Sequence, residues 1–552
     1  MADETVLAAA RAWIAADPDA ETRDELTAIL DRAADGDADA SADLHDRFDA
    51  RLEFGTAGLR GVLGAGPNRM NRLVVAQTSA GLARFLLGRE DEPHVVIGYD
   101  GRKNSSVFAI DAAKVLAGAG ARVTLLPRLL PTPVLAFAVR HLAASAGIMI
   151  TASHNPARDN GYKLYLGGDS AGSQIVPPAD ARVFEAITAV VDEDAEIPRS
   201  ADYATADESL IEAYIAETAA AFALPDIDLP WVYTPMHGVG WETFSRVLTA
   251  ADAPVPALVT EQVEPDPEFP TVAFPNPEEE GALDLALATA RETGAELIIA
   301  NDPDADRLAV AVRRAPGEWE QLRGNEIGLM LAWSAAERAA REGRTGTLAS
   351  SIVSTPGLGV IARAYGLGYT ETLTGFKWIS RVPGLIFGFE EALGYLVDPE
   401  KVRDKDGISA ALAALQIVLE QRVRGVGFDR YRASFVERFG WFGSDQISIR
   451  VTDLSEIGAV MERLRAETPA SIGGISVVRV DDLRTGSAEL PPSDVLRLQL
   501  GDGARVIVRP SGTEPKLKVY LDVAVTDGPA EGRATRGAAL LTRLTDGMRA
   551  LL

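Results

Sequence analysis

Short, mainly apolar runs separated by helical stretches are the feature that most restricts the fold of this chain. Such runs occupy residues 95–97, 147–150, 296–300 and 385–388, and a loop with glycine or polar residues follows each of them. Strands that are apolar on both faces are typical of the buried sheets of βαβ units. The pattern therefore predicts α/β domains in which strands and helices alternate along most of the chain.

The length of 552 residues requires several domains, because a typical domain holds about 100–200 residues. We expect three mixed-sheet α/β domains followed by a C-terminal α+β domain. A proline-rich acidic stretch at 264–280 is expected to form a long surface loop. The predicted boundaries are 1–45 for a helical extension, 46–204, 205–322 and 323–435 for the α/β domains, and 436–552 for the α+β domain.

The charge balance excludes several partners. Eighty acidic residues against 54 basic ones give a formal net charge of −26, which repels nucleic acid and anionic membranes. No apolar run reaches the roughly 18 residues of a membrane span, and the N-terminus lacks the basic region of a secretory signal. The chain has no cysteine, which excludes thiolate metal sites and cysteine nucleophiles. We therefore expect a cytoplasmic protein with no nucleic-acid or membrane partner.

Lysine is scarce, since only eight of the 54 basic residues are lysines. Unlike arginine, lysine loses its proton at an accessible pKa and can serve as an acid or base. The lysines therefore point to sites, although chance clustering is the alternative with so few residues. Five of the eight lie in or near polar loops, and these are Lys163, Lys377, Lys405, Lys516 and Lys518.

Ser153 lies in the first of four loops that could carry chemistry. The loop 151–156 follows the apolar run 147–150 directly and places Ser153 and His154 before a proline. The structural alternative is an ordinary strand-to-loop turn with a capping serine. A hydrolase elbow is excluded, because Thr151 and Asn155 stand where its two glycines would be.

Three carboxylates form the second loop. Asp302, Asp304 and Asp306 occupy alternate positions after the run 296–300, where ligand sites of parallel sheets lie. Carboxylate oxygens converging on one point are typical of a Mg²⁺ site. A solvated acidic turn is the alternative. An EF-hand is excluded, because its glycine and distal glutamate are missing.

The two remaining loops are weaker signals. Glu390 and Glu391 follow the run 385–388 and could accept hydrogen bonds from sugar hydroxyls, but an exposed charge pair fits equally well. The loop 509–516, between two predicted strands, combines Arg509 with hydroxyls and a glycine and favours phosphate binding. An ordinary hairpin turn is its alternative.

Together the four loops resemble those of the α-D-phosphohexomutase superfamily, in the same order. Loops 151–163, 302–307, 388–391 and 509–515 are similar to its phosphoserine, metal, sugar-recognition and phosphate-binding loops. The stretch 54–61 resembles its N-terminal motif. Residues 374–377 and 403–407 look most like the phosphoglucomutase-2 and phosphopentomutase-like branch.

The resemblance implies four domains around a central active-site cleft, with a role for each matched residue. The implied catalytic residues are Ser153, His154, Lys163 and Arg60, and the implied metal ligands are Ser153, Asp302, Asp304 and Asp306. The implied sugar-binding residues are Arg307, Thr374, Gly375, Lys377, Glu390, Glu391 and Lys405. The implied phosphate-binding residues are Arg509, Ser511, Gly512, Thr513 and Lys516.

The implied activity is a phosphosugar mutase that interconverts 1- and 6-phosphates of glucose or mannose. It would use a phosphoserine, Mg²⁺ and a sugar bisphosphate, as a monomer or homodimer. Ala392 and Tyr395 replace a serine and a histidine found in other branches, so a phosphopentomutase acting on ribose or deoxyribose phosphates is the alternative. More distant alternatives are a metal-dependent sugar phosphatase and a non-catalytic sugar-phosphate-binding protein.

Overall fold

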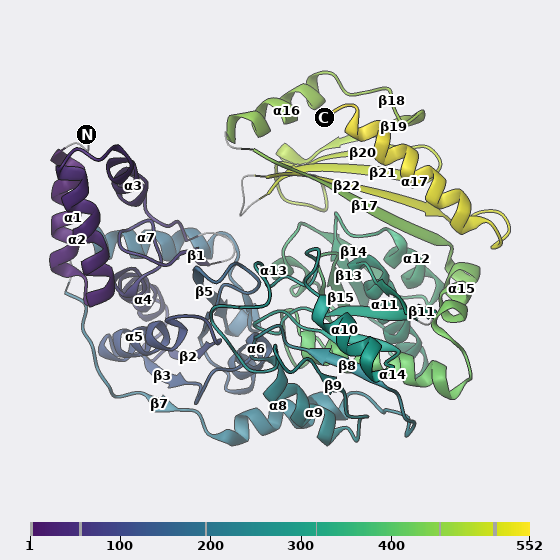
Figure 1. The fold of residues 1–552 in the computed structure, drawn as a ribbon, viewed down its shortest axis with the longest axis horizontal. Helices are drawn as coiled ribbons and strands as arrows, with labels where there is room; N and C mark the ends of the chain where they lie inside the picture. Colours follow the sequence, from purple (N-terminus) through teal and green to yellow (C-terminus); the bar gives the residue numbers. More distant parts are fainter. Residues whose placement is uncertain (1–3, 55–57, 194–195, 316, 452–453, 512–515) are drawn as a thin grey trace. The chain divides into compact units, whose positions relative to one another are not determined.

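The computed structural model describes residues 4–54, 58–193, 196–315, 317–451, 454–511 and 516–552. It divides into two compact units, one formed by Met1–Gln321 with Asp398–Gln416 and the other by Leu322–Val397 with Ile417–Leu552. Each unit contains two β-sheets (Figure 1). The domain boundaries expected from the sequence stay a prediction.

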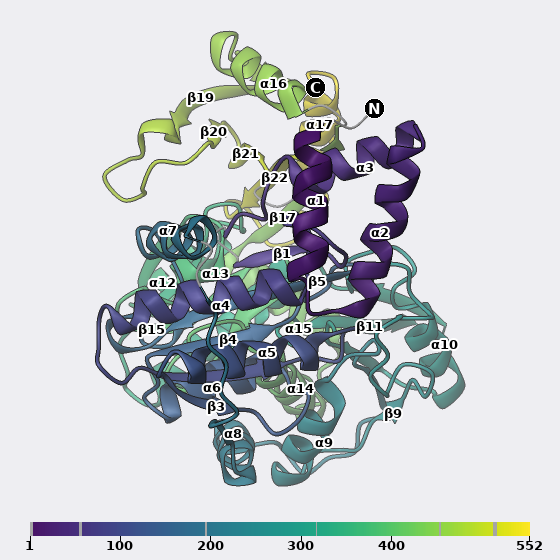
Figure 2. The same ribbon diagram turned by 90° about the vertical axis from the view of Figure 1, so that its left-hand side faces the viewer.

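Three helices precede the first sheet: α1 (Glu4–Ala16), α2 (Ala20–Ala34) and α3 (Ala38–Phe48). The side chains of Asp19 and Asp37 accept backbone N–H groups at the starts of α2 and α3. Buried Trp13, Leu26 and Leu44 belong to the same apolar core as the first sheet. Figure 2 shows the three helices side by side. The extension therefore packs on the first sheet.

The first sheet is mixed. Its strands are β1 (Leu59–Val62), β2 (His94–Tyr99), β3 (Arg122–Leu125), β4 (Ala146–Ile150), β5 (Asp159–Leu166), β6 (Ser173–Gln174) and β7 (Ala204–Thr205). They follow the order β1-β5-β4-β2-β3-β7, with β6 paired to β5. Strands β4, β2, β3 and β7 are parallel. Beyond β4 the sheet continues with β5, which is antiparallel to β4, and with β1, which is antiparallel to β5.

Helices cover both faces of this sheet. They are α4 (Arg72–Leu87), α5 (Ser105–Gly118), α6 (Thr132–His141) and α7 (Ala179–Asp192), with a short 3₁₀ helix at Gly168–Ser170. Helices α4, α5 and α7 share one core with the sheet. Helix α6 packs closely on the other face, where Gly147 of β4 leaves it room: a Cβ there would lie 2.2 Å from Val139.

The second sheet belongs to the same unit. Its strands are β8 (Trp231–Thr234), β9 (Ala257–Leu258), β10 (Leu297–Ala300), β11 (Ala309–Ala315) and β12 (Glu318–Gln321), in the order β12-β11-β10-β8-β9. Its helices are α8 (Glu208–Ala220), α9 (Gly240–Ala250) and α10 (Asp284–Thr293). The stretch 264–280 is a loop, but its expected surface position is wrong in part. Phe269 and Asn276 are only 4% and 7% exposed.

The third and fourth sheets form the second unit. The mixed third sheet has the order β14-β13-β15-β16, and the fourth is antiparallel with the order β17-β22-β21-β20-β19-β18. The third contains β13 (Thr347–Ser351), β14 (Gly368–Thr372), β15 (Leu385–Glu390) and β16 (Gly394–Leu396). The fourth contains β17 (Trp441–Arg450), β18 (Ser471–Ile472), β19 (Ile475–Asp482), β20 (Leu496–Leu500), β21 (Ala504–Pro510) and β22 (Lys516–Val525).

Helices complete the second unit. They are α11 (Gly324–Arg341), α12 (Gly357–Ala364), α13 (Phe376–Ile379), α15 (Phe428–Phe439), α16 (Leu454–Ala466) and α17 (Arg533–Arg549), with a 3₁₀ helix at Leu483–Thr485. Helix α14 (Gly407–Val423) begins in the first unit and ends in the second. Three mixed sheets followed by an antiparallel sheet with two helices confirm the predicted fold class. Among the described residues, every helix is too short or too polar to cross a bilayer.

Candidate active site

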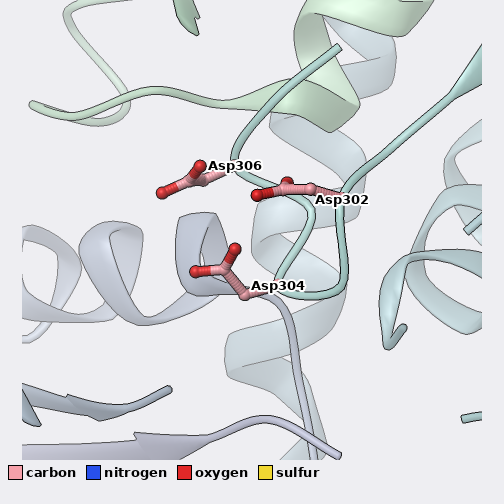
Figure 3. A group of neighbouring side chains, drawn as sticks. All are labelled: Asp302, Asp304 and Asp306. Atoms are coloured by element: carbon pink, nitrogen blue, oxygen red, sulfur yellow. The ribbon is translucent and has the colours of Figure 1, made fainter. Parts of the chain in front are cut away.

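Three carboxylates meet in the loop that follows β10. Asp302, Asp304 and Asp306 are fully buried or nearly so, and Ala305 between them has a left-handed φ of 55°. One oxygen from each carboxylate lies within 4.8 Å of the other two (Figure 3). The alternate spacing thus folds into a convergent cluster, and the alternative of a solvated acidic turn is wrong.

The cluster fits a metal ion. Asp304 Oδ1 and Asp306 Oδ1 are buried and accept no hydrogen bond from any described residue. Buried carboxylate oxygens without a hydrogen-bond partner are costly, and a bound cation would satisfy them. Three oxygen ligands with positions left open suit a hard divalent cation.

Two lysines and a threonine surround the cluster from different elements. Lys163 Nζ, on β5, lies 2.7 Å from Asp304 Oδ2 and 3.0 Å from Asp306 Oδ2. Lys405 Nζ lies 3.1 Å from Asp306 Oδ2. Thr132 Oγ1, at the start of α6, donates to Asp304 Oδ2 at 2.6 Å. The first and second sheets and the segment 398–416 therefore all contribute to one site.

A glycine brings Lys405 to this place. Gly407 packs directly on the backbone of the metal loop, and a Cβ there would lie 2.3 Å from the Arg307 carbonyl oxygen. Its N–H donates to the Ala305 carbonyl oxygen at 3.2 Å. The Asp404 carboxylate accepts hydrogen bonds from Tyr165 and from the Lys405 backbone at 2.8 Å. These contacts hold the segment 398–416 against the metal loop and the first sheet.

The pKa of Asp302 is shifted upward, whereas the pKa values of Asp304 and Asp306 are shifted downward. Burial and the charges of Asp304 and Asp306 raise the pKa of Asp302 well above its ordinary value. Burial alone would also raise the pKa of Asp306, but Lys163 and Lys405 lower it. The pKa of Asp304 is lowered in the same way, by Lys163 and by the hydrogen bond from Thr132. Fixed cations therefore keep two of the three carboxylates charged.

Ser153 lies beside this cluster. It follows β4, is 3% exposed and adopts a left-handed φ of 55°, which is uncommon for a residue with a Cβ. Its Oγ donates to Asp302 Oδ2 at 2.9 Å and lies 3.1 Å from His154 Nδ1. Burial and the charges of Arg307 and Arg60 lower the pKa of His154 well below its ordinary value. The buried Ser153 hydroxyl thus points at the carboxylate cluster and lies beside a neutral imidazole.

Two buried residues that were not predicted from the sequence support this loop. Arg102 is 4% exposed and donates hydrogen bonds to loop carbonyl groups, and Asp100 is 2% exposed and accepts one from Thr151. The signal was present, because both residues follow the apolar run 95–97 in the stretch 98–102. Arg60 joins the loop by donating to Asn155 Oδ1 at 3.0 Å. Residues 55–57 of its motif lie outside the described residues.

Most of the residues predicted to bind sugar lie in the second unit, whereas Arg307 and Lys405 lie in the first. Glu390 Oε1 accepts the Gly375 N–H at 2.6 Å, and Gly375 has a positive φ of 112° that suits glycine. Glu391 Oε2 accepts hydroxyl hydrogen bonds from Ser351 and Ser354 at 3.1 and 2.9 Å. The alternative of an exposed charge pair is therefore wrong.

Two further residues considered in the sequence, Lys377 and Tyr395, are buried in the second unit. Lys377 is 6% exposed on α13, one residue after Phe376 and three after Thr374. Tyr395 is fully buried and donates to the Gly324 carbonyl oxygen at 3.0 Å. Tyr395 therefore belongs to the core of the third sheet.

The predicted phosphate-binding loop joins β21 to β22. Arg509 is half-buried near the end of β21, and Ser511 donates its N–H to the Lys516 carbonyl oxygen at 2.8 Å. The predicted residues Gly512 and Thr513 lie outside the described residues. The described residues thus form the base of a hairpin.

Comparison with known proteins agrees with this arrangement. Four family profiles match in order: "Phosphoglucomutase/phosphomannomutase, alpha/beta/alpha" domains I, II and III at residues 51–193, 212–317 and 323–427, and the C-terminal domain at 447–534. The crystal structure of a phosphoglucomutase/phosphomannomutase family protein from Burkholderia thailandensis shares the fold. Its TM-score is 0.69 at 21% identity, over 91% of this chain and 97% of that one.

Relatives of similar length also match. A Haemophilus influenzae protein named "Probable phosphomannomutase" is 51% identical over 490 residues, covering 88% of this chain and 98% of the relative. The "Phosphoribomutase" of Saccharomyces cerevisiae is 36% identical over 583 residues, covering 93% and 92%. The "Phosphopentomutase" of Homo sapiens is 34% identical, covering 92% and 90%. The chain therefore belongs to the phosphoglucomutase/phosphomannomutase family.

Proposed function

We propose that this chain is a phosphosugar mutase that interconverts 1- and 6-phosphates of glucose, mannose or both in the cytoplasm. One observation carries the proposal. The Ser153 hydroxyl lies 2.9 Å from Asp302 Oδ2, in a buried cluster of three carboxylates that fits a divalent cation. A serine beside a metal-binding carboxylate cluster is suited to carry a phosphoryl group, because phosphoryl transfer depends mainly on positioning and charge.

The proposed reaction has two transfers. The free hydroxyl of a sugar monophosphate attacks phosphoserine 153, the bond between phosphorus and Ser153 Oγ breaks, and a sugar bisphosphate forms. The sugar hydroxyl loses a proton and Ser153 Oγ gains one. After the bisphosphate turns over, Ser153 Oγ attacks its other phosphoryl group and the protons move back. Added sugar bisphosphate would act as activator.

Residues around Ser153 have distinct proposed roles. His154 would accept or return the Ser153 proton, since its Nδ1 lies 3.1 Å from Ser153 Oγ. Burial alone would lower the pKa of Lys163, but Asp304 and Asp306 raise it, which favours a fixed ammonium charge over proton transfer. Asp302, Asp304 and Asp306 would hold Mg²⁺, which supplies positive charge to phosphoryl oxygens when bound.

The remaining site residues are assigned to the substrate. We assign the sugar hydroxyls to the loop of Glu390 and Glu391. Arg60, Arg307 and Lys405 would add positive charge around the transferred phosphoryl group. Thr374, Gly375 and Lys377 would assist sugar binding, and Arg509, Ser511, Gly512, Thr513 and Lys516 would grip the phosphate that does not react.

A hexose phosphate is the preferred substrate. The 51% identity to the protein named "Probable phosphomannomutase" exceeds the 36% and 34% identities to the proteins named "Phosphoribomutase" and "Phosphopentomutase". Ribose and deoxyribose phosphates are the second candidate, because those relatives still cover 92–93% of the chain.

The proposal is tested by one substrate panel. Glucose-, mannose-, ribose- and deoxyribose-1-phosphate are each incubated with the protein, Mg²⁺ and glucose 1,6-bisphosphate, and products are followed by ³¹P NMR. We expect conversion of a hexose 1-phosphate to its 6-phosphate without release of free phosphate. Release of free phosphate alone would indicate a phosphatase, and no turnover on any sugar would indicate a binding protein.

The Ser153→Ala variant tests the phosphoserine. It should lose nearly all mutase activity and keep the fold, and intact-protein mass should show no added phosphoryl group after incubation with the bisphosphate. Ser245→Ala is the matched control, because this serine is partly exposed on α9 and its hydroxyl donates to the Glu242 carbonyl oxygen of the same helix. Activity near the wild-type value in Ser153→Ala would refute the assignment.

A further inference from the structure

Arg102 binds the backbone of the Ser153 loop at four points. Its Nη2 donates to the carbonyl oxygens of Ser153 at 2.6 Å and Asn155 at 2.5 Å. Its Nη1 donates to the carbonyl oxygens of Pro156 at 2.9 Å and Asp159 at 3.1 Å. The planar fork of one guanidinium therefore satisfies four acceptors of a single loop, which a lysine ammonium cannot reproduce.

Asp100 fixes both Arg102 and the start of the loop. Its Oδ1 accepts the Arg102 backbone N–H at 3.0 Å and the Ser105 hydroxyl at 2.7 Å. Its Oδ2 accepts the Thr151 hydroxyl at 2.6 Å, and Thr151 Oγ1 in turn accepts the Ser153 N–H at 2.8 Å. Each link is buried, so the network is rigid and its geometry is specific.

An aromatic ring from the loop 264–280 lies against Arg102. The guanidinium carbon lies 5.0 Å from the centroid of the Phe269 ring, in the loop 264–280. The same loop places Phe274 against His154, with ring centroids 6.1 Å apart. The second sheet therefore supports the Ser153 loop as well as supplying the carboxylates.

We propose that Arg102 is a positioning residue that sets the Ser153 hydroxyl for phosphoryl transfer. The inference rests on the proposed function. Ser153 holds a left-handed φ that a residue with a Cβ leaves readily when unsupported. Without the four hydrogen bonds the loop relaxes, and Oγ moves away from Asp302. Arg102 itself touches neither the reacting atoms nor the carboxylate cluster through any hydrogen bond of the described residues.

The test compares Arg102→Met, Arg102→Lys and Phe269→Leu with the wild type. Displacing a reacting group by about 1 Å costs roughly 100-fold in rate, so kcat should fall by about that factor in both Arg102 variants. The KM for the sugar phosphate and the Mg²⁺ concentration for half-maximal activity should stay unchanged. Phe269→Leu should lower kcat by a smaller factor than the Arg102 variants do. Phosphorylation of Ser153 by glucose 1,6-bisphosphate, followed by intact mass, should slow in parallel with kcat.

Arg72→Met is the matched control. Arg72, at the start of α4, donates to the buried Asp111 carboxylate of α5 at 2.6 and 3.1 Å, so it joins two helices rather than the Ser153 loop. The Arg72→Met variant should lose thermal stability but keep the wild-type kcat and the wild-type rate of Ser153 phosphorylation.

Three outcomes would overturn the positioning role. They are wild-type kcat in both Arg102 variants, a KM that rises with kcat unchanged, and an Arg72→Met variant that slows phosphorylation equally. If Arg102→Met does not fold, Arg102→Lys and Phe269→Leu decide by the same criteria. A wild-type protein without phosphoserine 153 or turnover would instead refute the proposed function, so the two failures are distinguishable.

Discussion

Replacing Lys163 by methionine should strongly destabilise the metal-free protein. The Lys163 ammonium lies 2.7 Å from Asp304 Oδ2 and 3.0 Å from Asp306 Oδ2, and its side chain is only 6% exposed. At an effective dielectric constant of about 20, each attraction is worth roughly 6 kcal/mol before desolvation. Removing one partner of a buried pair costs about 3–5 kcal/mol net, because a buried charge is left uncompensated. Methionine keeps the apolar stem and isolates the loss of the charge.

Thermal unfolding in EDTA at pH 7.5 measures this effect. A cooperative unit of about 150–250 residues loses roughly 2–4 °C in Tm per kcal/mol, so a fall of about 6–20 °C is expected. Lys103→Met is the matched control, since Lys103 pairs with Glu21 at 2.6 Å but the two side chains are 46% and 70% exposed. An exposed pair contributes less than about 1 kcal/mol. Equal Tm shifts in the two variants would refute the reasoning.

Three further perturbations follow from the site and its surroundings. Asp304→Asn should raise the Mg²⁺ concentration for half-maximal activity about tenfold, equal to roughly 1.4 kcal/mol, and an unchanged titration curve would contradict the metal site. Gly407→Ala should lower activity and weaken Mg²⁺ binding by isothermal titration, because its Cβ would meet metal-loop backbone at 2.3 Å. Gly427→Ala, with open space around it, should do neither. Burial lowers the pKa values of His94 and His237 below 6.5, so the unfolded chain binds more protons below that pH and stability falls. The free energy of unfolding should fall by up to about 1.4 kcal/mol per pH unit per histidine. Urea unfolding at several pH values should show a smaller fall in the His94→Gln, His237→Gln double variant. An equal dependence of stability on pH in the double variant and the wild type would argue against this role of the two histidines.

Local sequence pattern predicted the strands and the loops that carry the chemistry. Apolar runs at 147–150 and 296–300 became β4 and β10, because a strand buried on both faces must be apolar throughout. The alternate spacing of Asp302, Asp304 and Asp306 was visible for the same reason. A loop that directly follows a parallel strand lies at the edge where ligands bind.

Local pattern could not predict which distant groups meet. The position of Arg102 after an apolar run marked it as a candidate, but not its role, because its hydrogen-bond acceptors are backbone carbonyl groups about fifty residues away and no side-chain type identifies them. The stretch 264–280 was expected at the surface because it is acidic and rich in proline. Phe269 is nevertheless buried, and its ring lies against the Arg102 guanidinium, which follows a strand of the first sheet.

The sequence by itself determined the fold class, the family resemblance and the identity of the reactive residue types, because these depend on short-range periodicity and on motifs. The tertiary structure alone decided the electrostatics of the site. Ser153 and Asp302 are 149 positions apart, and Lys405 reaches Asp306 from a third segment. Burial and charge act through space, so the pKa values of the three carboxylates and the direction of the Ser153 hydroxyl arise only when the two sheets and the segment 398–416 pack together.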